Sequence, residues 1–245
     1  MRAIVFISSV ENPEEPIDIS QNAFTPVPDN EIVNDFDLIA VEAAIQLKES
    51  GDLDEVIVFG MGTALSHLQK CLAMGADRAI SAPCNRSQIT PETIVETAIT
   101  AFNDNPTSET LWMFGKLGVN FESHQTAQRL AVRLGIPCLS SVHTIQRHDD
   151  TWHITCESDN GIPCFHVSAP FVMTADLRLA TPRFPSLPNI VRSRKKPVSE
   201  IQPVMAPPGL TLKTTHIEPA QENRRTCQFL NGTKGCQTLL TLLRP

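Results

Sequence analysis

Short apolar runs and longer stretches of helical periodicity alternate along the first half of the chain. Residues 3–7 are a continuous apolar run, as expected of a strand covered on both faces, and further short strands are predicted at residues 55–59, 78–82 and 110–114. After each run, apolar residues recur at the spacing of an amphipathic helix, within residues 38–48, 65–72, 91–102 and 127–134. Strands that alternate with helices predict an α/β fold with a parallel sheet and helices on both of its faces.

A different pattern begins after Pro137. Short runs separated by the turn-forming residues Asp149-Asp150 and Asp159-Asn160-Gly161 predict an antiparallel meander added to the parallel core. These runs lie at residues 142–148, 151–157 and 163–168. A further buried strand is predicted at 171–173. By contrast, residues 10–32 are rich in proline, asparagine and acidic residues, and they are predicted to form a long loop.

The C-terminal part of the chain is rich in proline and has little periodicity. We expect an α/β domain at residues 1–198 and an extended arm at residues 199–245. Near the end of the arm, residues 233–243 have the pattern of a short amphipathic helix whose leucines lack an apolar neighbour in sequence. Exposed apolar patches usually mark an interface, so the arm is predicted to pack on a partner subunit.

Composition restricts the class of protein. The chain has 245 residues, which is enough for a sizeable core, and no window approaches the ~18 apolar residues of a membrane span, so direct membrane insertion is not expected. The net charge is −7 while basic residues cluster near 192–196, which argues against nucleic-acid binding. The seven cysteines include no C-x-x-C pair. A disulfide framework and a zinc site are therefore not expected, and a cytoplasmic location is favoured.

Ligand-binding loops are expected at the carboxyl ends of the parallel strands. These loops lie at residues 6–9, 34–37, 60–63 and 115–126. Glycines in the last two allow close approach of a ligand to the backbone, and a helix N-terminus favours a phosphate group. Neither a G-x-G-x-x-G nor a Walker A motif is present, so classical dinucleotide and NTPase sites are not supported.

No motif fixes a nucleophile and a base together. The histidines in or beside the meander are interpreted as surface or hydrogen-bonded core residues: His143, His148, His153 and His166. Cys156 and Cys164 are interpreted as reduced thiols, and no metal site is predicted. The chain is therefore not expected to be an enzyme by itself, and any electrons would travel through a bound cofactor.

Residues 174–197 are the most unusual stretch. Its prolines at 182, 185 and 188 predict that no ordinary helix or central strand forms there. Leu187 lies between two of these prolines, and cations surround it at Arg183, Arg192, Arg194, Lys195 and Lys196. Two interpretations stay open at this point: a solvated surface connection, or a loop that docks a leucine and a basic patch on another protein.

The run T-A-D-L-R-L-x-x-P-R-F-P-S-L-P-N-I in this stretch resembles the signature of electron transfer flavoprotein beta subunits. Further similarities lie at Phe36–Ala44, Leu72–Arg78, Gly115-Lys116 and Gln125-Thr126, so the resemblance covers most of the chain. It implies a Rossmann-like sheet of the adenine nucleotide alpha hydrolase-like type. It also implies a heterodimer in which an alpha subunit holds most of the redox-active FAD, while the beta subunit binds a structural AMP.

The resemblance further implies that residues 174–197 form a recognition loop. In the family, the exposed leucine of this loop, here Leu187, anchors in a flavin-linked dehydrogenase such as an acyl-CoA dehydrogenase. The basic residues expected to assist docking are Arg183, Arg192 and Lys195.

By the same resemblance, the nucleotide site draws on the loops at the strand ends. Its residues are Phe6, Asn34, Asp35, Phe36, Asp37, Met61, Gly115, Lys116, Val119, Asn120, Ser123, His124, Gln125 and Thr126. The chain departs from the family pattern at Asp35, Asn120, Phe121 and Ala127, where the family has proline, two aspartates and glycine. Three alternatives therefore stay open: a second FAD, as in electron-bifurcating members, an empty site, or a regulatory nucleotide-binding module without a redox role.

Overall fold

The computed structural model describes residues 1–14, 18–20, 23–25, 30–102, 109–120, 122–205, 215–216 and 229–243. The chain divides into two compact units. One comprises Met1–Pro16 and Pro26–Leu212, and the other comprises Ile17–Thr25 and Lys213–Pro245. Phe121 and most of the expected C-terminal arm, at 206–214 and 217–228, lie outside the described residues.

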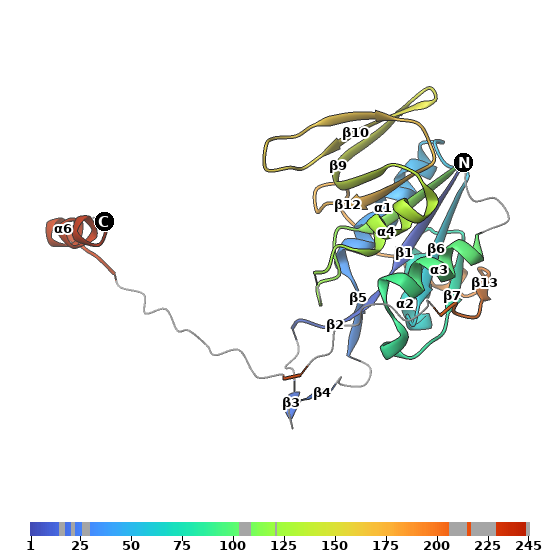
Figure 1. Cartoon of the computed structure of the whole chain (residues 1–245), viewed down its shortest axis with the longest axis horizontal. Helices are drawn as coiled ribbons and strands as arrows, with labels where there is room; N and C mark the ends of the chain where they lie inside the picture. Colours follow the sequence, from blue (N-terminus) through green and yellow to red (C-terminus); the bar gives the residue numbers. More distant parts are fainter. Residues whose placement is uncertain are drawn as a thin grey trace. The chain divides into compact units, whose positions relative to one another are not determined.

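The first unit is built on a nine-stranded sheet (Figure 1). Neighbouring strands are parallel along the order β9-β12-β8-β1-β6-β7-β13. Their bounds are β9 Cys138–His148, β12 Phe171–Ala175, β8 Thr110–Gly115, β1 Arg2–Ile7, β6 Glu55–Met61, β7 Arg78–Ala82 and β13 Val198–Glu200. The parallel sheet and the buried strands expected from the apolar runs are confirmed.

Helices cover both faces of this sheet, as the alternation of elements predicts. They are α1 (Asp35–Glu49) and α2 (Leu65–Met74) on one face, and α3 (Pro91–Ala101) and α4 (Thr126–Leu134) on the other. Successive residues of β1 pack alternately into the two hydrophobic cores, one on each face of the sheet: Val5 packs with α1 and α2, and Phe6 packs with α3 and α4. The hydroxyl of Thr90 caps α3 by accepting from Thr93 N at 3.2 Å.

The order in which the chain adds strands to the sheet reverses at β1. From β1 the chain builds β6 and β7 on one side, and it then returns through α3 to β8 on the other side. In open α/β sheets such a reversal leaves a crevice at the carboxyl ends of the two central strands. The fold therefore places a binding crevice beside β1 and β8.

The antiparallel meander is also confirmed. β10 (Thr151–Cys156) pairs antiparallel with β9, and β11 (Cys164–Val167) pairs antiparallel with β10. One face of β10 is buried through Trp152 and Ile154. In Figure 1, β9 and β10 are drawn in yellow tones, and β11 forms the edge of the sheet beyond β10.

Residues 10–32 are more regular than expected. β2 (Ser9–Glu11) pairs antiparallel with β5 (Glu31–Val33), so this stretch is not one long loop. These strands have only three residues each, which is too short for a period of two to be visible in sequence.

The expectation that prolines exclude a helix within 174–197 is wrong for its second half. Helix α5 spans Leu187–Ser193, and Pro188 lies in its first turn. A residue in the first turn has no intrahelical acceptor for its N–H, so proline removes no hydrogen bond there. Ile190 N donates to Ser186 O at 2.9 Å and closes the turn.

The sheet continues past the expected domain boundary at residue 198. β13 pairs in parallel with β7, and Ile201 N donates to Ser81 O at 2.9 Å. All residues of β13 are exposed, as is usual for an edge strand, so no apolar alternation marks it in the sequence.

The second unit contains a hairpin and a helix. β3 (Asp18–Ser20) pairs with β4 (Ala23–Thr25), and α6 (Gly232–Leu242) confirms the helix expected near the C-terminus. Its leucines are exposed: Leu239, Leu240, Leu242 and Leu243. Within the described part of the chain, no helix has the length and apolar character needed to cross a membrane.

Candidate functional site

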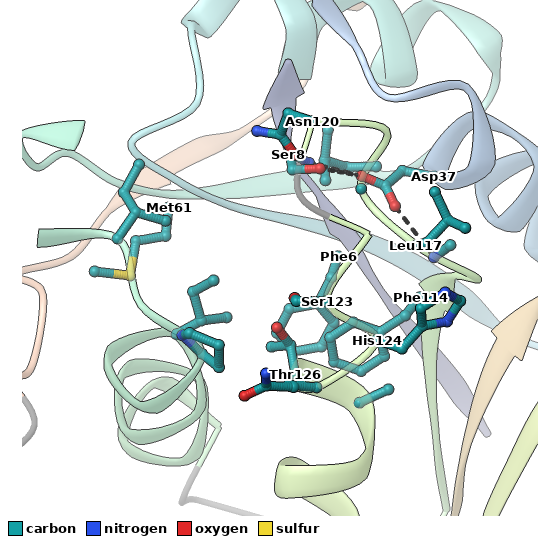
Figure 2. A pocket seen from close by; sticks show the side chains of 18 of the residues that line it. Phe6, Ser8, Asp37, Met61, Phe114, Leu117, Asn120, Ser123, His124 and Thr126 are labelled. Carbon is teal, nitrogen blue, oxygen red and sulfur yellow. Dashed lines mark hydrogen bonds between the residues drawn. The ribbon is translucent and has the colours of Figure 1, made fainter. Parts of the chain in front are cut away.

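A cavity of about 340 Å³ lies where the carboxyl ends of β1, β6 and β8 meet (Figure 2). Most of the residues named from the sequence for a nucleotide site line it: Phe6, Asp37, Met61, Gly115, Lys116, Asn120, Ser123, His124, Gln125 and Thr126. Asn34, Asp35, Phe36 and Val119 lie in the same loops without lining the cavity. The volume is in the range of small-molecule sites.

Aromatic rings form part of the wall. The rings of Phe6 and Phe114 stack with centroids 3.9 Å apart and an angle of 14° between them. Phe59 meets Phe6 edge-on at 5.2 Å. Met61 lies on the opposite side of the cavity (Figure 2). A flat aromatic surface and a polarizable thioether suit a planar aromatic ligand ring.

Asn34 braces the loop at 115–126. This buried residue precedes α1, but its side chain makes no capping bond to that helix. Instead its Nδ2 donates to Leu117 O at 2.8 Å, and its Oδ1 accepts from Val119 N at 3.4 Å. Asn34 therefore positions the neighbouring loop without facing the cavity itself.

Asp37 joins three of the loops. Its Oδ2 accepts from Ser8 N at 2.9 Å and from Ser8 Oγ at 2.6 Å, and its Oδ1 accepts from Gly115 N at 3.1 Å. Figure 2 shows these bonds beside the cavity. Burial raises the pKa of Asp37 from 3.8 to about 6, and the donors from Ser8 oppose that shift only in part.

A carboxyl group with a raised pKa in the folded state makes stability fall as pH rises. Between pH ~4 and ~6 the folded chain holds more protons at Asp37 than the unfolded chain does, so the unfolding free energy decreases across this window and levels off above it. The shift is equivalent to roughly 3 kcal/mol. Asp37→Asn cannot titrate and should lack this slope. Urea unfolding of wild type and Asp37→Asn from pH 4 to 7 measures this slope. A difference in unfolding free energy between the two proteins that does not change with pH would rule out this titration.

Gly115 is required by close packing. A Cβ atom at this position would lie 2.4 Å from Asp37 Oδ1 and 2.7 Å from the carbonyl carbon of Phe36. Such distances are far below van der Waals contact, and one of the two partners is backbone. The end of β8 can therefore approach the start of α1 only with glycine at this position.

The loop that follows Gly115 has unusual backbone angles. Glu122 and His124 have φ values of 47° and 48°, in the left-handed region that non-glycine residues rarely adopt. Strained backbone of this kind is concentrated at ligand sites. The loop leads directly into α4, whose N-cap residue Gln125 makes no side-chain capping bond. Ser123, Gln125 and Thr126, at the start of this helix, line the cavity, so its positive end faces the cavity (Figure 2).

Lys116 connects the cavity to the start of residues 174–197. Its Nζ lies 3.1 Å from Asp176 Oδ2 and 4.0 Å from Glu157 Oε2. Arg178 pairs with the same two carboxylates. Although burial raises the pKa of Asp176, the bond from Lys116 and the backbone N–H of Arg178 bring it below its ordinary value. Asp176 therefore stays ionised and holds Lys116 at the cavity wall.

Sequence reasoning missed the far end of the cavity. This end includes Arg86 and Ile89, which follow β7, and Glu31, whose Oε1 lies 3.1 Å from Arg86 Nη1. Arg86 also pairs with Glu11. No sequence motif marks these residues: Arg86 and Ile89 lie after the end of β7, and Glu31 lies on the three-residue strand β5.

A serine and a histidine also meet beside the cavity. Ser9 Oγ lies 2.7 Å from His67 Nδ1, and His67 Nε2 lies 3.0 Å from Glu31 O. A carbonyl oxygen only accepts, so Nε2 carries the proton and Nδ1 accepts from the hydroxyl. Burial lowers the pKa of His67, which favours this neutral form. The pair fastens β2 to α2.

The four residues named for docking differ in environment. Leu187, at the start of α5, is 79% exposed, and Arg192 and Lys195 are exposed as well. Arg183 instead holds the stretch against α1: its Nη2 lies 2.8 Å from Glu42 Oε1 and its Nη1 lies 2.6 Å from Glu49 Oε1. These bonds, first those to Glu49 and then those to Glu42, raise the pKa of Arg183 above its ordinary value.

Comparisons with known proteins agree with this architecture. Residues 25–205 match the family model of the electron transfer flavoprotein domain. An electron transfer flavoprotein subunit beta of Bradyrhizobium diazoefficiens is 35% identical over 170 residues, which cover 69% of this chain and 67% of that one. The human subunit beta is 32% identical over 199 residues, covering 79% and 77%. That of Syntrophomonas wolfei is 27% identical over 223 residues, covering 90% and 87%.

Proposed function

Because this chain belongs to the beta-subunit family of electron transfer flavoproteins, we propose that it binds a structural AMP in the cavity beside β1 and β8. The observation that carries the proposal is the joining of the strand-end loops around one cavity, with an aromatic wall at Phe6 and Phe114 and a helix N-terminus at Thr126. The aromatic wall suits the adenine ring, and the helix N-terminus suits the phosphate group.

We also propose that the chain pairs with an alpha subunit, which holds most of the redox-active FAD. The exposed leucines of α6 support this pairing, because an apolar helix face of this kind is a common interface feature. FAD supplies the electron-transfer chemistry of the heterodimer. The beta subunit contributes a rigid nucleotide-containing base for it, and it is an electron carrier subunit without a reaction of its own. We also propose that the heterodimer is cytoplasmic.

A flavin-linked dehydrogenase is the proposed partner in electron transfer. Leu187 would enter an apolar pocket of that enzyme, and Arg192 and Lys195 would guide the encounter. Arg183 has a different part in the proposal. Since it is bonded to Glu42 and Glu49, it would hold the stretch against α1 so that Leu187 stays presented.

The nucleotide content of the purified heterodimer tests the proposal. We expect heat-denatured protein to release AMP and FAD in equal amounts, one of each per heterodimer. Release of FAD alone in twofold amount would support the second-flavin alternative, to which the far end of the cavity, at Arg86 and Ile89, offers additional lining. A heterodimer that retains FAD but releases no AMP would contradict nucleotide binding by this subunit.

A further inference from the structure

Three histidines share the exposed face of the meander, outside the nucleotide site. His148 ends β9, His153 lies in the middle of β10, and His166 lies on β11. His153 and His166 are directly opposite each other in the antiparallel pairing of β10 with β11. His148 is diagonal to His153, because His153 pairs with Gln146 on β9. The three imidazoles therefore form one row across three adjacent strands.

The rings in this row are in contact. The centroids of His153 and His166 are 4.0 Å apart with an angle of 18° between the rings. Those of His148 and His153 are 4.4 Å apart with an angle of 51°. His148 and His166 are exposed to solvent. Three contacting imidazoles on an open surface do not contribute to the core, so packing does not explain the row.

The backbone beneath the histidines is held by the opposite face. Trp152 and Ile154, the neighbours of His153 on β10, are fully buried in the core. Since successive residues of a strand point to opposite faces, this burial fixes the direction of His153 away from the core. The strands thus present the three imidazoles from a rigid sheet, which favours a multidentate site.

Imidazole nitrogen is a preferred ligand of Zn²⁺, Ni²⁺ and Cu²⁺. Directly opposite residues of an antiparallel pair have Cβ atoms about 4.5–5.5 Å apart, a separation that two imidazoles can bridge through one metal ion. In the structure the rings stack, and the described residues include no set of three metal-ligating side chains already arranged around one point. A shared metal ion would therefore require the exposed rings of His148 and His166 to turn out of the stack toward the half-buried His153.

We propose that His148, His153 and His166 form a surface site for a late divalent transition metal ion such as Zn²⁺. His153 is its central residue, because it contacts both of the others. The exposed thiol of Cys164 lies on the same strand face as His166, two residues away, and it is a candidate for a fourth ligand.

Calorimetric titration of the full chain with Zn²⁺ and with Ni²⁺ tests the site. The protein is prepared without a histidine tag and is first treated with a chelator, and Mg²⁺ serves as the negative control. We expect one Zn²⁺ or Ni²⁺ per chain, and at least about tenfold weaker binding by His153→Gln, because loss of even an outer partner of a metal ligand costs that much. His166→Gln should have a similar effect.

Two control variants separate this site from other binding. Gln146→Ala removes the non-ligand residue opposite His153 on the same face, and His216→Gln removes a histidine outside the meander. Both should bind as tightly as wild type. Equal affinity of wild type and His153→Gln, or no binding by wild type, would overturn the proposal. Thermal unfolding without metal checks that the variants are folded. None of these outcomes depends on AMP or FAD content, so the proposed function is tested separately.

Discussion

Gly115→Ala is expected to remove nucleotide binding and to destabilise the chain by about 1–3 kcal/mol or more. The added methyl group would lie 2.4 Å from Asp37 Oδ1 and 2.7 Å from the backbone of Phe36. Relief of this overlap requires the end of β8 and the start of α1 to separate. That movement breaks the bond from Gly115 N to Asp37 and displaces the loop that Asn34 braces.

Gly118→Ala is the matched control in the same loop. A Cβ at Gly118 would meet only Asn120 Oδ1, at 3.0 Å, which is the end of a side chain that can rotate away. Its urea midpoint should stay close to wild type, and its AMP content should fall far less than that of Gly115→Ala. The measurement is AMP released per heterodimer together with the unfolding free energy. Wild-type AMP content in Gly115→Ala would show that the nucleotide does not bind at this loop.

The strands and helices that position the site could be predicted because each carries a strong local signal. Residues 3–7 of β1 are a continuous apolar run, and α3 begins at a threonine followed by proline. The places of the binding loops followed from topology alone, since parallel strands end at one edge of the sheet. These signals therefore determine the strands, helices and loop positions that surround the site.

The contacts within the site could not be predicted in the same way. Asp37 meets Ser8 and Gly115 across 29 and 78 residues of sequence, and only packing brings them together. At the cavity Arg86 pairs with Glu11 and Glu31, which lie on strands of three residues that leave no periodic pattern. The resemblance named Arg183 for docking, whereas its guanidinium is bonded to two glutamates of α1. Such distinctions require the partners of each charge to be known.

Leu187→Ala is expected to weaken docking of the dehydrogenase by about ten- to a hundredfold. Burial of a leucine side chain contributes about 1.5–3 kcal/mol, and about 1.4 kcal/mol corresponds to tenfold in affinity. Leu187 is 79% exposed in this chain, so nearly all of that area is free for a partner. Pro185 and Pro188 restrict the backbone around it, which lowers the ordering entropy lost on binding.

Val191→Ala is the matched control, because Val191 lies on the same short helix and is 61% exposed. We expect a much smaller loss than for Leu187→Ala. Both variants should retain wild-type FAD and AMP, since neither residue lines the cavity. Replacement of Arg192 or Lys195 should lower mainly the association rate with the dehydrogenase. This effect should become smaller at high salt, which screens the charges.

The rate at which a flavin-linked dehydrogenase and its substrate reduce the bound FAD is the most direct test of the central claim. It is followed by loss of the visible flavin absorption, for wild-type and Leu187→Ala heterodimers over a range of dehydrogenase concentrations. The account predicts full reduction of wild type, and a half-saturating dehydrogenase concentration about ten- to a hundredfold higher for the variant. Wild-type FAD that no such dehydrogenase reduces, or equal half-saturation for the two proteins, would contradict it.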